Sequence, residues 1–138
     1  MAQIRKSRVT SRTNGTVAIE YGFILPVLLL FTLGIMDAGR LLWTYMTLYR
    51  ATEAAARCGA VNSTLCGTSG QIAAYAVTQA WGLTIASSAF TVTTPTCGVQ
   101  VRGTYTFQFV IPWFSPIQPL GSANTIHLSA TACDTKQY

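Results

Sequence analysis

Residues 15–36 read GTVAIEYGFILPVLLLFTLGIM, and this stretch decides how the chain is organised. Sixteen residues from Tyr21 to Met36 carry no charge, and Thr16–Ile19 extend the apolar run. The run then has about 20 residues, the length with which a helix crosses a bilayer. We therefore predict a membrane-spanning helix at about residues 17–37. A carboxylate, Glu20, interrupts it near its start.

The charge distribution predicts an orientation for this helix. Before it stand four basic residues, Arg5, Lys6, Arg8 and Arg12. From residue 16 onward, five Lys and Arg against four Asp and Glu leave a net charge of +1. The positive-inside rule then keeps the N-terminus in the cytoplasm and exports the chain after about residue 38. No basic face for phosphates remains in the exported part, so we expect no nucleic-acid partner.

The composition fits one domain and an anchor. The chain has 138 residues, of which 50% are hydrophobic and 9% are charged. Typical soluble domains carry about 25% charged residues. Three interpretations of the apolar segment follow: a cleaved secretory signal, a plain signal-anchor, or a prepilin-type signal whose helix is kept. The run is long for the first, and no A-x-A cleavage site follows it.

Glu20 bears on the choice between the other two. An acid inside a membrane helix is costly and usually functional. The alternative explanation for Glu20 is that its carboxylate simply reaches the polar lipid headgroups. Pro26 inside the helix predicts a kink, or is simply tolerated as prolines in membrane helices are.

A family resemblance is carried by the same residues. Gly15, then Thr-Val-Ala-Ile, then Glu20-Tyr21 resembles the G/xxxxEY processing site of Flp-type pilins and pseudopilins. The stretch 15–40 resembles the N-terminal signature of the TadE-like (TadE/TadG) pseudopilin family of the tight-adherence (Tad/Flp) pilus system. The likeness includes Pro26 and a cluster at the far end of the helix formed by Gly34, Asp37, Gly39 and Arg40.

The resemblance implies a function. A prepilin peptidase of the inner membrane would cut between Gly15 and Thr16 and remove residues 1–15 as a basic leader. The chain would be a minor pseudopilin, a structural subunit that takes part in assembly of a type IVc (Tad) pilus used for adhesion or secretion. Its partners would be other pilin and pseudopilin subunits, the inner-membrane assembly platform and the lipid bilayer.

The implied location is the bacterial inner membrane, with the N-terminus cytoplasmic and the C-terminal domain periplasmic, or a pilus on the cell surface. The alternative function is a permanently membrane-anchored periplasmic or surface binding domain, such as an adhesin, that does not polymerise.

Elementary electrostatics gives Glu20 a role in this scheme. Cleavage creates a new ammonium on Thr16, and in a bundle of such helices the carboxylate of one subunit can neutralise the ammonium of its neighbour. In a low dielectric the pair attracts strongly, and either charge alone is costly. Glu20, with Tyr21 beside it, would then set the register between packed helices.

Beyond the membrane we expect an α+β domain. One long helix is predicted over 16–57, ended by Cys58-Gly59, and the exported domain occupies 58–138. Trp43 and Tyr45 are either membrane-interface or core residues. A short helix follows in SGQIAAYAVTQAWG, with Ser69 as its cap and Gly82 as its stop. Alternating apolar residues then predict a small antiparallel sheet of three strands, around 90–92, 99–109 and 126–132.

The four cysteines, Cys58, Cys66, Cys97 and Cys133, are predicted to form disulfides. Zinc sites need closely paired ligands, which this spacing lacks, and an exported chain with an even cysteine count favours disulfides. Of the three possible connectivities we favour Cys58–Cys66, a short loop at the helix end. That choice leaves Cys97–Cys133, between the middle and last strands.

We find no residues for catalysis, a metal or a cofactor, and predict that the chain is not an enzyme. His127 lies in a strand pattern without an acidic neighbour, and no nucleophile, carboxylate-pair or phosphate-loop motif occurs. In the proline-rich stretch 110–119, Trp113 and Phe114 are either a contact surface or core residues.

Overall fold

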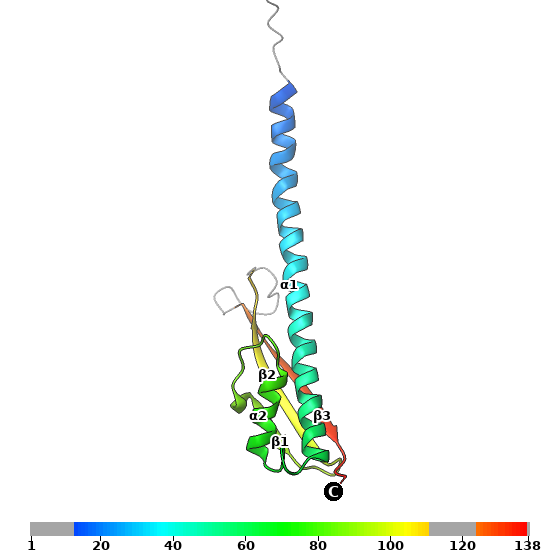
Figure 1. Cartoon of the computed structure of the whole chain (residues 1–138). Helices are drawn as coiled ribbons and strands as arrows, with labels where there is room; N and C mark the ends of the chain where they lie inside the picture. Colours follow the sequence, from blue (N-terminus) through cyan, green and yellow to red (C-terminus); the bar gives the residue numbers. More distant parts are fainter. Residues whose placement is uncertain (1–12, 111–123, 138) are drawn as a thin grey trace, which may run out of the picture. The chain divides into compact units, whose positions relative to one another are not determined.

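The computed structural model describes residues 13–110 and 124–137, and its elements confirm an α+β fold (Figure 1). Helices α1 (Thr13–Val61) and α2 (Ser69–Gln79) come first. A short 3₁₀ turn, η1 (Ser87–Ala89), leads into strands β1 (Phe90–Thr93), β2 (Val99–Gln108) and β3 (Thr125–Asp134). The chain divides into two compact units, Met1–Ile35 and Met36–Tyr138, and each is described by itself.

Helix α1 extends beyond the expected range 16–57 at both ends, and Pro26 lies inside it. Our prediction that Gly59 ends this helix is wrong, because the helix continues to Val61. The glycine serves close packing instead. A Cβ atom on Gly59 would lie 2.7 Å from Cδ1 of Ile72 and 2.9 Å from Cγ1 of Val99.

The sheet has the order β1-β2-β3, with both pairs antiparallel. Its strands occupy the stretches where apolar residues alternate, so the period of the sequence located them. Between β1 and β2 the chain turns at Pro95–Gly98, where the Gly98 amide donates to the Pro95 carbonyl at 3.0 Å. Gly98 has a φ of +118°, a region that favours glycine.

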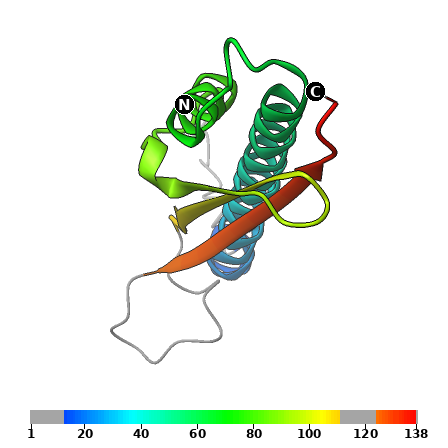
Figure 2. The same ribbon diagram turned by 90° about the horizontal axis from the view of Figure 1, so that it is seen from below.

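The hydrophobic core of the second unit lies between the sheet and the Met36–Val61 part of α1, which runs across one face of the sheet (Figure 2). Gly103 in β2 permits this approach. A Cβ atom there would lie about 3 Å from side-chain atoms of Leu48, Thr52 and Phe90. The centre of the core is formed by Leu48, Ala51, Ala55, Ala56, Ile72, Ala76, Phe90, Val99 and Val101.

Helix α2 is capped by Thr68, so our choice of Ser69 as the cap is wrong by one residue. The Thr68 hydroxyl accepts from the Gln71 amide at 3.3 Å, and the Gln71 side chain accepts from the Thr68 amide at 3.1 Å. This reciprocal capping box satisfies two amides that the helix itself cannot pair. The helix ends at Gln79, three residues before the Gly82 predicted to stop it.

Both favoured disulfides are formed, and the connectivity Cys58–Cys66 and Cys97–Cys133 is confirmed. The first joins the end of α1 to the following loop across 8 residues. The second joins residues 36 apart and ties the turn before β2 to the end of β3. No free cysteine remains among the four.

Candidate assembly segment and the Asp37 contact

The N-terminal unit presents its apolar side chains outward. Along α1 the side chains of Phe23 and Phe31 are 76% and 69% exposed. A helix in water shows one apolar stripe and one polar face, whereas from Ile19 to Met36 large apolar residues are exposed on every side of the helix. So much uncovered apolar surface indicates contact with lipid or with other helices. The helix is long and apolar enough to cross a membrane.

Glu20 and Tyr21 lie near the start of this apolar segment, and both are exposed. Among the described residues no side chain forms an ion pair with Glu20. One turn earlier in the sequence, Gly15 and Thr16 belong to the first turn of α1. At Gly22 a Cβ atom would meet nothing within 4 Å, so the small residue leaves room beside the helix backbone. Small residues of this kind let membrane helices approach closely.

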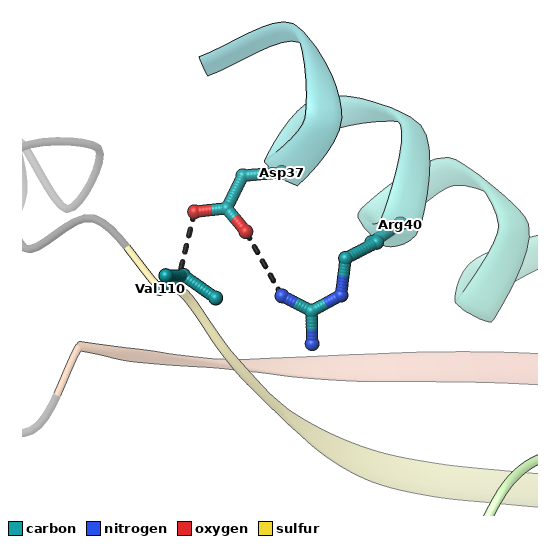
Figure 3. Close-up of polar contacts among 3 residues, drawn as sticks. All are labelled: Asp37, Arg40 and Val110. Carbon is teal, nitrogen blue, oxygen red and sulfur yellow. Dashed lines mark hydrogen bonds and ion pairs between the residues drawn. The ribbon is translucent and has the colours of Figure 1, made fainter. Parts of the chain in front are cut away.

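In the second unit, Asp37 joins α1 to the end of β2 (Figure 3). The side chain is nearly inaccessible, with 2% of the residue surface exposed. Its Oδ2 accepts a hydrogen bond of 3.0 Å from the backbone amide of Val110, and its Oδ1 accepts one of 3.0 Å from the Arg40 guanidinium. Buried carboxylates are costly unless they are paired and hydrogen-bonded, and this one is both.

Arg40 extends the same contact toward the sheet. Its guanidinium carbon lies 5.5 Å from the ring centre of Phe107, within the range of cation–π attraction. The Phe107 ring in turn meets Phe109 edge to face, with centroids 5.2 Å apart. The hydrogen bond from Val110 to Asp37 and the cation–π contact of Arg40, linked by the Asp37–Arg40 ion pair, therefore fix the helix beside the last residues of β2.

The sequence analysis placed Asp37 and Arg40 only in the signature cluster at the far end of the apolar helix, and it missed this contact. A signal was present, since an acid directly after an apolar helix with an arginine three positions later can form an i,i+3 pair. What the spacing does not reveal is the third partner, because Val110 is 73 residues away.

The remaining candidates are placed as follows. His127 lies on the exposed face of β3, with Nδ1 3.1 Å from the Thr106 hydroxyl. In residues 13–110 and 124–137 no three His, Cys, Asp or Glu side chains gather as a metal-ligand set. Trp43 and Tyr45 are 54% and 40% exposed, so neither is a core residue. Trp113 and Phe114 lie outside the described residues.

The fold and the exposed apolar helix together define a class of protein: an α+β domain preceded by a segment suited to membrane anchoring. Residues 15–57 match the family described as TadE-like protein, which confirms the resemblance carried by Gly15, Glu20 and Tyr21. No curated protein and no solved structure matches the chain. The TadE-like family is a structural family and indicates a protein associated with the Tad pilus.

Proposed function

We propose that the chain is a minor pseudopilin, a membrane-anchored structural subunit that takes part in assembly of a type IVc (Tad) pilus. One observation carries the proposal. The TadE-like match begins at residue 15, at the proposed cleavage site, and covers the helix whose apolar side chains are exposed. A helix with such a surface is stable only where lipid or neighbouring subunits cover it.

The proposed topology follows from the two ends of the apolar segment. The basic leader stays in the cytoplasm by the positive-inside rule, and a prepilin peptidase removes it between Gly15 and Thr16. The second unit is exported to the periplasm. Its two disulfides support this location, because disulfides form and persist in oxidising compartments.

Within this scheme Glu20 acts between subunits. Its carboxylate is exposed and has no ion-pair partner in the described part of its own chain. The ammonium that cleavage leaves on Thr16 of a neighbour supplies the missing charge. In an apolar helix bundle this pairing favours one register, because other registers leave two unpaired charges in a low dielectric. Gly22 leaves space for the neighbouring helix.

The test compares Glu20→Ala with Glu53→Ala, which removes an exposed acid from the outer part of the same helix. Each variant is expressed in a host with a Tad system, and the chain is quantified in sheared pili and in the membrane. Removing one partner of a buried pair costs about 3–5 kcal/mol. We therefore expect Glu20→Ala to lower incorporation into pili by at least about tenfold, while Glu53→Ala leaves it unchanged.

Export is checked separately, by protease accessibility of the second unit from the periplasm. Normal export of Glu20→Ala with reduced incorporation supports an assembly role. Incorporation equal to that of the unaltered chain would contradict the role of Glu20. A chain that stays in the membrane fraction in every variant, and in the unaltered form, would favour the anchored domain that does not polymerise.

A further inference from the structure

Exposed apolar side chains gather at one end of the second unit, the end where α1 enters it. We call these residues the entry patch: Leu42, Trp43, Trp81 and Val110. Trp81 is 75% exposed, and each of the other three is more than half exposed. At the other end of α1 the surface is mixed, because the exposed Val61 and Leu65 line a hollow together with Arg57. Apolar exposure without intervening charge is therefore a property of the entry patch.

Two contacts bring the later residues of the patch to the first turns of α1 in this unit. The Val110 amide donates to Oδ2 of Asp37 at 3.0 Å. A Cβ atom on Gly82 would lie 2.6 Å from Cη2 of Trp43, so the chain after α2 passes directly against this ring. Trp81 is the adjacent residue. Folding of the second unit thus adds Trp81 and Val110 to the side chains that α1 itself exposes.

The covalent chain limits how far the patch lies from the end of the apolar run. That run ends at Met36, and α1 continues without a break to Val61. With a rise of 1.5 Å per residue, the Cα atom of Trp43 lies about 11 Å along the helix from Met36. Both residues belong to the second unit, so this distance holds without reference to the first. Headgroup layers extend about 5–8 Å beyond the hydrocarbon on each side, and helical side chains lean toward the N-terminus. The Trp43 ring therefore reaches the headgroup layer of a bilayer that ends near Met36.

The chemistry of the patch suits that layer. Tryptophan has an apolar ring with one N–H donor, and it is enriched where membranes meet water. In the described part of the chain, no hydrogen bond from the indole N–H of Trp43 or Trp81 is formed. Both donors are thus available to the phosphate and ester oxygens of lipids, while the rings and the neighbouring Leu42 face the upper acyl chains.

We infer that the entry patch rests in the lipid headgroup layer of the membrane that α1 spans, with Trp43 and Trp81 as its anchors. Lipid is the occupant because the patch begins one to two helical turns after the apolar run and continues the exposed apolar surface of α1, where Met36 is 67% exposed. The inference rests on the membrane anchoring contained in the proposed function.

Trp81 provides the decisive test, because it reaches the patch only through the fold and not through its place on α1. The chain contains three tryptophans, at positions 43, 81 and 113. Replacing Trp43 and Trp113 by phenylalanine leaves Trp81 as the only reporter. The full chain is placed in nanodiscs of lipid brominated on the acyl chain next to the headgroup. We expect the Trp81 emission to fall by about twofold or more relative to unbrominated lipid, and iodide in the water to quench it little.

Two matched reporters, each in a chain whose native tryptophans are replaced by phenylalanine, supply the controls. Leu65→Trp places an exposed ring after the end of α1, where Val61 is about 38 Å along the helix from Met36. Iodide should quench this reporter, and brominated lipid should not. Phe31→Trp places a ring in the exposed apolar stretch, and lipid brominated deeper in the acyl chain should quench it.

The outcomes separate this inference from the proposed function. Quenching of the Phe31→Trp reporter by lipid, with Trp81 open to iodide and untouched by bromine, would overturn the inference and leave the anchoring intact. A Phe31→Trp reporter that lipid does not quench would contradict the anchoring itself. Trp81 shielded from iodide but not quenched by lipid would show that protein covers the patch, and would overturn the choice of lipid.

A second measurement uses the unaltered chain, so it does not depend on how the variants fold. Lipids with a nitroxide on the headgroup should broaden the indole N–H signal of Trp81 in NMR spectra of the nanodisc. An unbroadened Trp81 signal would overturn the inference.

Discussion

Two stretches of α1 are both rich in apolar residues but have opposite surroundings. Between Ile19 and Met36 the helix exposes its large side chains, with Phe23 at 76%. In the second unit Leu48, Ala51 and Ala55 on the same helix are completely buried. Within the described residues the first stretch is left uncovered, whereas the second is covered by the sheet and α2.

The difference shows that the two stretches of the helix are suited to different surroundings, one to an apolar environment outside the chain and the other to the core of the second unit. The exposed stretch can gain apolar contacts only from lipid or other helices, so its stability depends on that surrounding. The buried stretch contributes to the free energy of folding of the second unit, where burying one leucine side chain is worth about 1.5–3 kcal/mol. Substitutions in one stretch should therefore change unfolding, and substitutions in the other should change membrane association.

The largest expected effect concerns the disulfide that closes the longer loop. Replacing Cys97 and Cys133 by serine should lower the free energy of unfolding of the second unit by about 4 kcal/mol, and replacing Cys58 and Cys66 by about 2.5 kcal/mol. The order follows from loops of 36 and 8 residues. The measurement is amide exchange of β2 in nanodiscs. Equal losses for the two pairs would show that loop length does not control the stabilisation.

The next effect comes from one substitution made in both stretches. Leu48→Ala should cost about 3 kcal/mol, because it opens a cavity at a side chain with no exposure. Leu29→Ala should leave the unfolding of the second unit unchanged, since Leu29 lies in the other unit and is 51% exposed. Denaturant titration of both variants gives the comparison. A similar loss for both would contradict the separation of the helix into two stretches.

A smaller effect is expected at the contact between α1 and β2. Asp37→Ala should cost about 2 kcal/mol, because it leaves the Val110 amide without its charged acceptor. Arg40→Ala should cost less than about 1 kcal/mol, since the Arg40 side chain is 55% exposed and its ion pair is screened by water. The same titrations measure both. A greater loss for Arg40→Ala would show that the cation–π contact with Phe107, rather than the carboxylate, holds the helix.

Much of this architecture could be predicted from the sequence. The alternation of apolar residues located the strands, and the uncharged run located the exposed part of α1. The disulfide pairing followed from placing Cys58 at a helix end, close in sequence to Cys66, which left Cys97, just before the middle strand, to pair with Cys133 in the last strand. These features depend on local pattern, which the sequence states directly.

The misses share a physical cause, which is tertiary packing. Gly59 resembles the glycine that often follows the end of a helix, but it lies inside α1. There the close approach of Ile72 and Val99 leaves no room for a Cβ atom. The hydrogen bond between Asp37 and Val110 joins distant residues that no local pattern relates. For the exposed stretch of α1, the motif around Gly15 and Glu20 predicts a role in assembly. The partner that this role requires lies on another molecule, so the structure of one chain does not contain it.

The most direct test of the account is the intact mass of the chain recovered from membranes of cells that contain a prepilin peptidase. The account predicts a chain that begins at Thr16 and keeps the apolar helix. A chain that still begins with the basic leader would favour the alternative function, a membrane-anchored domain that does not polymerise. A chain that begins after residue 37 would show that the apolar segment is a discarded signal, and would contradict the pseudopilin proposal.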